Sequence, residues 1–212
     1  MAKNWNEYKH VTTMTGTVLF SHIKQTEEIL GKDTGKYTLC VAFDDEDIEK
    51  LNKVAMDEFI KATEDDFAGK KFKKGIDPVV GEKEYNGQRY LRFSTGASYQ
   101  TKTGRNFVVT VPIFDAVKNT ITNNVGELGH GSKVRINYTI IPYYMTANNF
   151  GVTLRLGAIQ LLDYKPLGEQ SADDFGFGTV EGGFDGTSIK DNDLPWTPAD
   201  GEADEEDAGG DF

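Results

Sequence analysis

Alternation of apolar and polar residues recurs along most of the chain and restricts it to a mainly β fold. Short segments rich in Val, Ile, Tyr and Phe alternate in this way, and Gly, Asn and Pro separate them. Such a period of two places every second side chain on the same face of a β-strand. In the first segment, Val18, Phe20 and His22 are therefore expected to share one face. The segments predicted as strands are residues 18–22, 37–43, 90–95, 107–114, 133–144 and 150–164.

One segment has a different period. Between residues 44 and 67 the apolar residues fall three or four apart, which predicts an amphipathic helix capped by Asp44 or Asp45. The apolar positions are Ile48, Leu51, Ala55, Phe59 and Ala62. Several strands interrupted by one helix predict that residues 1–165 form an OB-fold, a small Greek-key β-barrel with one inserted α-helix. A plain β-sandwich stays open as the alternative, because periodicity does not distinguish the two.

Residues 166–212 differ from the rest in charge and composition. From residue 173 to the C-terminus there are 13 acidic residues and one Lys, a net charge of −12, whereas the whole chain carries −11, so residues 1–172 carry +1. A charged, Gly-rich segment with isolated apolar residues buries too little surface to offset its chain entropy. We therefore expect a disordered acidic C-terminal tail, joined to a near-neutral domain.

The single cysteine and the absence of long apolar runs bear on the cellular compartment. Cys40 has no partner for an internal disulfide and lies in a predicted strand, so we interpret it as a reduced, buried thiol. No apolar run reaches the roughly 18 residues that a membrane helix needs, and the N-terminal residues lack the apolar core of a signal peptide. We expect an intracellular protein that has no membrane partner.

The segment 131–144 carries the strongest functional signal. Lys133 and Arg135 share one strand face, and Tyr143 has the same parity if Pro142 does not shift the register. At about 3.3 Å per residue, Arg135 and Tyr143 would lie roughly 26 Å apart, which is enough for several nucleotides. Proteins that bind single strands combine cations for the phosphates with aromatic rings for the bases. The alternative is an ordinary solvated strand face, with Tyr143 and Tyr144 packed in the core.

Other cations and aromatic residues extend this pattern. Arg92 and Arg155 each alternate with apolar residues in a predicted strand. Tyr99 and Lys102 lie at the polar link 100–106, which predicts a hairpin loop. We therefore add these four residues to the candidate DNA-binding set. The lysine-rich residues 70–74 are equally consistent with a solvated linker and with phosphate contact.

Nothing in the sequence predicts an enzyme, a cofactor or a metal site. His10, His22 and His130 are scattered and have no Cys or acidic partner at metal-ligand spacing. Gly patterns typical of phosphate loops, nucleophile elbows and dinucleotide sites are also missing from the sequence. The four carboxylates at 44–47 suit the N-terminus of the predicted helix. We expect a protein without catalytic activity.

The C-terminal residues form a second candidate site, for a protein partner. An apolar ring and the terminal carboxylate coincide at Phe212, an arrangement suited to capture by a basic, hydrophobic pocket. The acidic charge also competes with DNA for the protein's own cations. Many acidic tails only raise solubility, but such tails do not need a terminal Phe. The candidate partner-binding residues are Asp204, Glu205, Glu206, Asp207, Asp211 and Phe212.

Three segments resemble the single-stranded DNA-binding replication proteins of short-tailed bacteriophages: residues 131–143, residues 97–100 and the terminal Gly210-Asp211-Phe212. The resemblance implies an OB fold with an inserted helix, a homodimer, strand annealing, and tail contacts to the phage DNA polymerase and helicase-primase. It also implies DNA contacts for particular side chains. These are Tyr143, Lys133 and Arg135, together with Lys3 and Lys102.

The residues and the resemblance together predict a protein that coats and protects single-stranded DNA without strong sequence preference. Its expected setting is phage DNA replication, recombination and repair in the cytoplasm of the infected bacterial host. The alternative is a non-enzymatic interaction or virion-assembly β-domain whose acidic tail binds a basic partner. That alternative predicts no binding to oligonucleotides at low salt.

Overall fold

The computed structural model describes residues 7–79, 82–101, 103–168 and 181–182. The chain divides into two units, Met1–Glu169 and Gln170–Phe212. The first unit contains every helix and strand of the described residues. Most of the predicted tail, including all of its candidate partner-binding residues, lies outside the described residues, as do Lys3 and Lys102.

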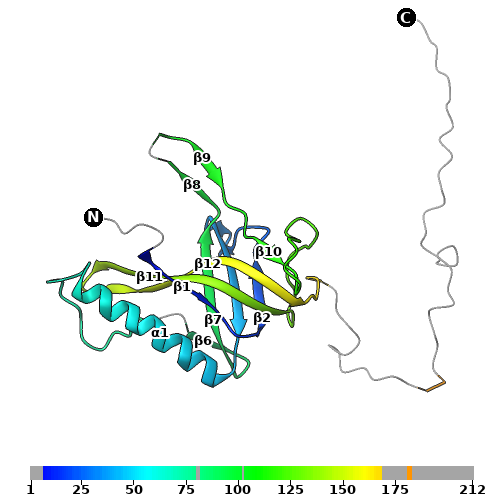
Figure 1. Cartoon of the computed structure of the whole chain (residues 1–212), viewed down its shortest axis with the longest axis horizontal. Helices are drawn as coiled ribbons and strands as arrows, with labels where there is room; N and C mark the ends of the chain where they lie inside the picture. The colour runs from blue at the N-terminus through cyan, green and yellow to red at the C-terminus, as the bar shows by residue number, and fades with distance from the viewer. Residues whose placement is uncertain (1–6, 80–81, 102, 169–180, 183–212) are drawn as a thin grey trace, which may run out of the picture. The chain divides into compact units, whose positions relative to one another are not determined.

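The described part of the chain contains one helix, α1 (Asp45–Glu64), and strands of very different length (Figure 1). The two longest strands form a hairpin, β11 (Lys133–Thr146) and β12 (Asn149–Asp163). Three strands of seven to nine residues also belong to the main sheet: β2 (Gly16–His22), β5 (Lys36–Ala42) and β7 (Gln88–Gly96). The shorter strands are β1 (Lys9–Thr12), β3 (Glu28–Ile29), β4 (Lys32–Asp33), β6 (Glu82–Tyr85), β8 (Ser98–Gln100), β9 (Asn106–Val108) and β10 (Ile113–Phe114).

Five strands close into a ring. β2 pairs with β5, β5 with β7, β7 with β12, β12 with β11, and β11 returns to β2. The β7–β12 pair is parallel, and the other four pairs are antiparallel. β1, β6 and β10 extend the ring at β11, β7 and β12. The closed ring with one inserted helix confirms the predicted OB-type barrel and excludes the sandwich.

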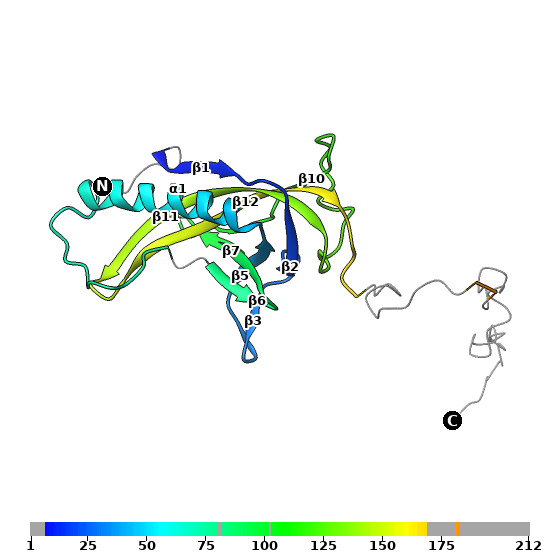
Figure 2. The ribbon, with the colours of Figure 1, turned by 90° about the horizontal axis from the view of Figure 1, so that it is seen from below.

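α1 agrees closely with the prediction. Its buried residues are Ile48, Leu51, Ala55, Phe59 and Ala62. Asp44 occupies the N-cap position, where its carbonyl accepts backbone hydrogen bonds from Asp47 and Ile48 at 3.0 Å, while its side chain makes no capping bond. The helix contacts β7, β11 and β12 and lies alongside the long hairpin (Figures 1 and 2). No helix in the described residues is both long and apolar enough to span a membrane.

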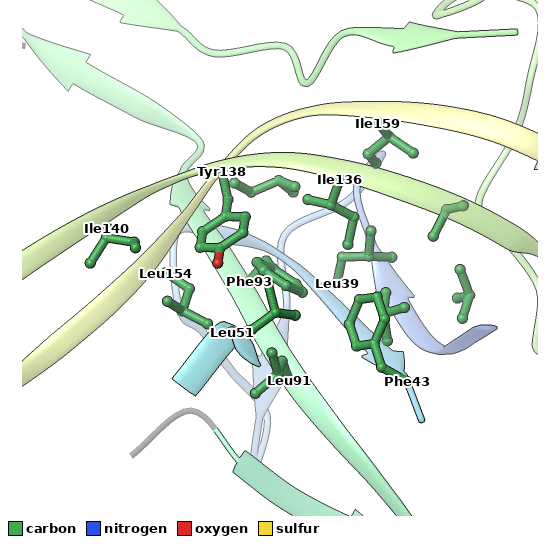
Figure 3. Packing of buried hydrophobic residues seen from close by; sticks show 14 of the residues in the cluster. Leu39, Phe43, Leu51, Leu91, Phe93, Ile136, Tyr138, Ile140, Leu154 and Ile159 are labelled. Carbon is green, nitrogen blue, oxygen red and sulfur yellow. The ribbon is translucent and has the colours of Figure 1, made fainter. Parts of the chain in front are cut away.

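The ring encloses the main hydrophobic core (Figure 3). Leu39, Leu91, Phe93 and Ile136 are fully buried there, and the Tyr138 ring meets the Phe93 ring at a centroid distance of 5.0 Å. Burying each such side chain contributes about 1.5–3 kcal/mol. The inward positions of β5, β7 and β11 alternate as predicted, so the opposite side chains of these strands point out of the barrel.

β2 departs from the predicted alternation. Val18 pairs with Val41 and Phe20 with Cys40, with a register shift between the two pairs. Val18 is buried in the core, whereas Phe20 is 41% exposed on the outside, as is His22. The prediction that these three residues share one face is therefore wrong, because a β-bulge reverses the parity of the residues that follow it.

Candidate nucleic-acid interface

Cations gather on the outside of the barrel. Arg92 on β7 lies opposite Cys40 of β5, and Arg155 on β12 lies opposite Ser94 of β7. Lys83 on β6 lies opposite Tyr90, and Lys36 begins β5. We call Lys36, Lys83, Arg92 and Arg155 the cationic face. The face contains two of the candidate residues predicted from sequence, Arg92 and Arg155, and brings them together on adjacent strands.

Arg92 has an internal partner. Its guanidinium forms an ion pair with the carboxylate of Glu27, and the Glu27 side chain is only 16% exposed. Backbone bonds on either side of this carboxylate fix the chain: Glu27 N–H donates to the Lys36 carbonyl, and Thr34 N–H donates to the Glu27 carbonyl, both at 2.9 Å. Glu27 therefore orients Arg92 and balances part of its charge.

Two hollows adjoin on this surface. The first, of about 260 Å³, is walled by Phe20, Tyr90 and Ile29, with Glu27 and Cys40 among its polar groups. We call it the aromatic hollow. The second, of about 320 Å³, is lined by Lys36, Ser94 and Thr153 among others, and we call it the polar hollow. Lys83 and Arg92 line both hollows, so two cations stand where the spaces meet.

Three aromatic rings meet beside the aromatic hollow. The Phe20 ring lies 4.9 Å from the Tyr85 ring and 6.3 Å from the Tyr90 ring, both in edge-to-face arrangements. The rings come from β2, β6 and β7, and all three side chains lie on the outside of the barrel. This wall combines apolar surface with the cations of the cationic face.

Cys40 lies in the aromatic hollow and is buried, as predicted. Burial raises the pKa of its thiol to about 11, while the nearby Arg92 acts in the opposite direction. The side chain is therefore a neutral thiol at physiological pH.

The two tyrosines at the far end of β11 have different surroundings. Tyr144 packs against Phe72 at 5.3 Å, its hydroxyl donates to the Lys71 carbonyl at 3.1 Å, and Lys70 lies 5.7 Å from its ring. This ring belongs to an aromatic cluster between α1 and the hairpin, so the core alternative is correct for Tyr144. Part of the lysine-rich segment 70–74 lies against the same ring.

Tyr143 is half-buried and keeps the outward parity, so Pro142 does not shift the register. It pairs with Gly151, where a side chain would meet the Pro78 carbonyl at 2.6 Å and the Tyr143 hydroxyl at 3.3 Å. Gly151 is two residues from Thr153, which lines the polar hollow. Tyr143 thus continues the outer surface beyond that hollow.

Lys133 and Arg135 lie at the opposite end of β11. The Lys133 ammonium donates to the Thr17 hydroxyl at 2.7 Å, and Arg135 Nε donates to the Thr13 carbonyl at 3.3 Å. Lys133 also lines a separate cleft of about 370 Å³ beside the start of α1. The structure therefore does not bring Tyr143 and Lys133 to one hollow: Tyr143 pairs with Gly151 on β12, while Lys133 lines the cleft beside α1.

Strands β8 and β9 form an arm that projects from the barrel (Figure 1). All of the strand residues in the arm are exposed. Tyr99 and Phe107 stack on each other at 5.3 Å with an interplanar angle of 12°, and they are 54% and 43% exposed. The arm thus carries two exposed rings, and the predicted hairpin around residues 100–106 is confirmed.

Sequence reasoning missed Lys36, Lys83, Phe20 and Tyr85. The signal for β6 was Asn86-Gly87, a two-residue hairpin turn in which both residues have positive φ, 50° and 74°. Phe20 had no such signal, because the bulge in β2 leaves no clear mark in the sequence.

Metal chemistry has no visible site in the part of the chain that the structure describes. No group of three or more His, Cys, Asp or Glu side chains is placed there to hold a metal ion.

Comparison with protein-family models identifies one family. A family model described as single-stranded DNA-binding protein, bacteriophage T7, matches residues 20–164. No curated protein sequence matches the chain. The fold is similar to the crystal structure of gp2.5, a single-stranded DNA-binding protein encoded by bacteriophage T7, with a TM-score of 0.59 and 21% identity over 84% of this chain and 98% of that chain.

A second solved structure has a similar fold. It is the single-stranded DNA-binding protein from bacteriophage Enc34 in complex with ssDNA, with a TM-score of 0.52 and 9% identity over 76% of this chain and 89% of that chain. The matched family consists of binding proteins, so the prediction of a non-enzymatic protein is confirmed. The family match covers well over half of the sequence. The chain therefore belongs to the bacteriophage T7-type family of single-stranded DNA-binding proteins.

Proposed function

We propose that this protein holds single-stranded DNA across the cationic face, from the aromatic hollow to Tyr143, without strong sequence preference. The observation that carries the proposal is the pair of hollows with Lys83 and Arg92 at their junction. Cations bind phosphates of any sequence, and aromatic rings stack on every base. The surface offers both kinds of contact across neighbouring strands.

Further contacts extend this path. Tyr99 and Phe107 present exposed rings on the arm. Lys3, Lys102, Lys133 and Arg135 add further positive charge. Their contribution is to affinity, through the phosphates, and not to the recognition of particular bases.

The proposed biological role is to coat and protect single-stranded DNA during phage DNA replication, recombination and repair, in the cytoplasm of the infected bacterial host. The acidic tail recruits the phage DNA polymerase and helicase-primase, with Phe212 as the anchor. The protein acts as a homodimer. These points rest on the sequence resemblance and on the composition of the tail.

A titration of fluorescent oligo(dT) tests the proposed surface. Affinity should fall with salt, with a log-log slope of about −0.7 for each phosphate contact. Replacing Tyr143→Ala should weaken binding by roughly 1–3 kcal/mol, the contribution of one stacked base, and leave thermal stability nearly unchanged. The matched control is Leu162→Ala, an exposed apolar residue near the opposite end of the β11–β12 hairpin. If neither salt nor the Tyr143→Ala substitution changes the affinity, the DNA binds at another part of the protein.

A further inference from the structure

We infer that the aromatic hollow is a subsite for one nucleobase of the bound strand, and that Lys83 and Arg92 hold the phosphate next to it. This inference rests on the proposed function and states which part of a nucleotide occupies which space. It assigns the base to Phe20 and Tyr90.

The dimensions and walls of the aromatic hollow suit a planar ring. Its volume of about 260 Å³ is large enough for one base, and it opens on the outside of the barrel between β2, β5, β6 and β7. Phe20 is 41% exposed there although Tyr85 contacts it edge-on at 4.9 Å. Three strands contribute aromatic surface here, and a ligand that stacks on it removes that surface from water, which favours binding.

The cations are placed for the adjoining phosphate. Lys83 and Arg92 line both hollows, so a phosphate at this junction would have a base-sized space on either side. Glu27 pairs with Arg92 and is mostly buried, which fixes the direction of the guanidinium. Arg presents several N–H donors, and one ion pair leaves others for phosphate oxygens.

Glu27 also explains why such a subsite tolerates every base. Its carboxylate lines the hollow, and a carboxylate accepts more hydrogen bonds than the one from Arg92. Each of the four bases carries at least one N–H donor on its pairing edge. The carboxylate therefore meets a donor whichever base enters, consistent with binding that is insensitive to sequence.

The first test compares an oligo(dT) with an abasic oligonucleotide of the same length, which has the same phosphates but no bases. Phe20→Ala should weaken binding of oligo(dT) about tenfold, the effect of losing one stacked base, and leave binding of the abasic strand unchanged. Leu162→Ala serves as the control and should bind both strands as the native chain does. Equal weakening for both strands would overturn the base assignment.

The second test uses the native protein, so it does not depend on whether the variant folds. Cys40 is the single cysteine of the chain and lies within the hollow. Its modification by methyl methanethiosulfonate at alkaline pH, followed by mass spectrometry, should slow at least fivefold with saturating oligo(dT). Saturating abasic strand should leave the rate unchanged.

The two tests distinguish a failure of the base subsite from a failure of the proposed DNA-binding function. If the native protein fails to bind oligo(dT) at low salt, the proposed function itself is wrong. If it binds with the expected salt dependence, but Phe20→Ala binds equally well or Cys40 keeps its full reactivity, the base subsite is wrong and the DNA-binding function stands.

Discussion

Among the described residues, one buried side-chain polar atom has no hydrogen-bond partner. It is the hydroxyl oxygen of Tyr138. The ring packs in the core against Phe93 (Figure 3), and burial raises the pKa of the hydroxyl far above its usual range. An unsatisfied buried hydroxyl costs about 1–3 kcal/mol. Tyr138→Phe should therefore raise the free energy of unfolding, by about 1 kcal/mol, as measured by urea denaturation.

Tyr144→Phe is the matched control for this substitution. The Tyr144 hydroxyl donates to the Lys71 carbonyl, so its removal should lower the free energy of unfolding or leave it nearly unchanged. A loss of stability in Tyr138→Phe would mean that the hydroxyl has a partner, such as a buried water molecule.

The position of the Phe20 side chain could not be predicted from the sequence. Alternation within β5, β7 and β11 gave the correct faces for Leu39, Arg92 and Tyr143, because the register of β11 with β12 is continuous from Tyr138 to Tyr144 and the pairing of β5 with β7 has no shift. The bulge in β2 moves Phe20 to the outside, and the residues around it carry no Gly or Pro to mark the change. A local pattern therefore could not identify the wall of the aromatic hollow.

Among the elements, the β8–β9 arm depends least on the rest of the fold. A two-stranded hairpin without a core is only marginally stable alone. Here the Tyr99–Phe107 stack and a bond from Thr101 N–H to the Arg105 carbonyl at 2.9 Å hold it together. At its base, Val109 N–H donates to the Ala97 carbonyl at 2.8 Å, so the two ends of the arm lie close together.

Replacing residues 98–108 with a short Gly-Ser link should thus leave the barrel folded. The melting temperature should change little, whereas affinity for oligo(dT) should fall about tenfold because at least one stacking contact is lost. Calorimetry and fluorescence titration provide the two measurements. Full affinity in the shortened protein would show that the arm does not contact DNA.

Prediction of elements from sequence succeeded where the pattern was long. All five apolar positions of α1 were identified, since a helix of five turns repeats its period several times. β6 was not predicted, because it is short and Glu82 and Glu84 disfavour a strand. Its Asn86-Gly87 turn was the available evidence.

For the whole molecule, charge separation between the two parts of the chain has a testable effect. Residues 1–172 carry +1 and the remainder carries −12. Deleting residues 200–212 should tighten DNA binding, most at low salt, because fewer carboxylates compete for the cations. Removing Phe212 alone should barely alter DNA affinity but sharply weaken capture by the phage polymerase or helicase-primase in surface plasmon resonance.

The outcome that contradicts this division of roles is equally specific. If removal of Phe212 leaves capture by both partners unchanged, the tail acts through its charge alone. The sequence predicted the barrel through its periodicity and the tail through its composition. It could not predict the two hollows, which depend on side chains from β2, β7 and β12 that only ring closure brings together.

The parallel pairing of β7 with β12 joins a strand from the middle of the chain to the last strand of the described residues. We call this pairing the β7–β12 seam. Arg155 of β12 lies opposite Ser94 of β7 there, and the polar hollow is lined from both strands, by Ser94 and by Thr153. A ligand that requires both sides of the seam binds only the closed ring, so by mass action it favours the folded state by about RT ln(1 + [L]/Kd). Single-stranded DNA bound along the proposed path would therefore stabilise the folded protein against heat and proteases.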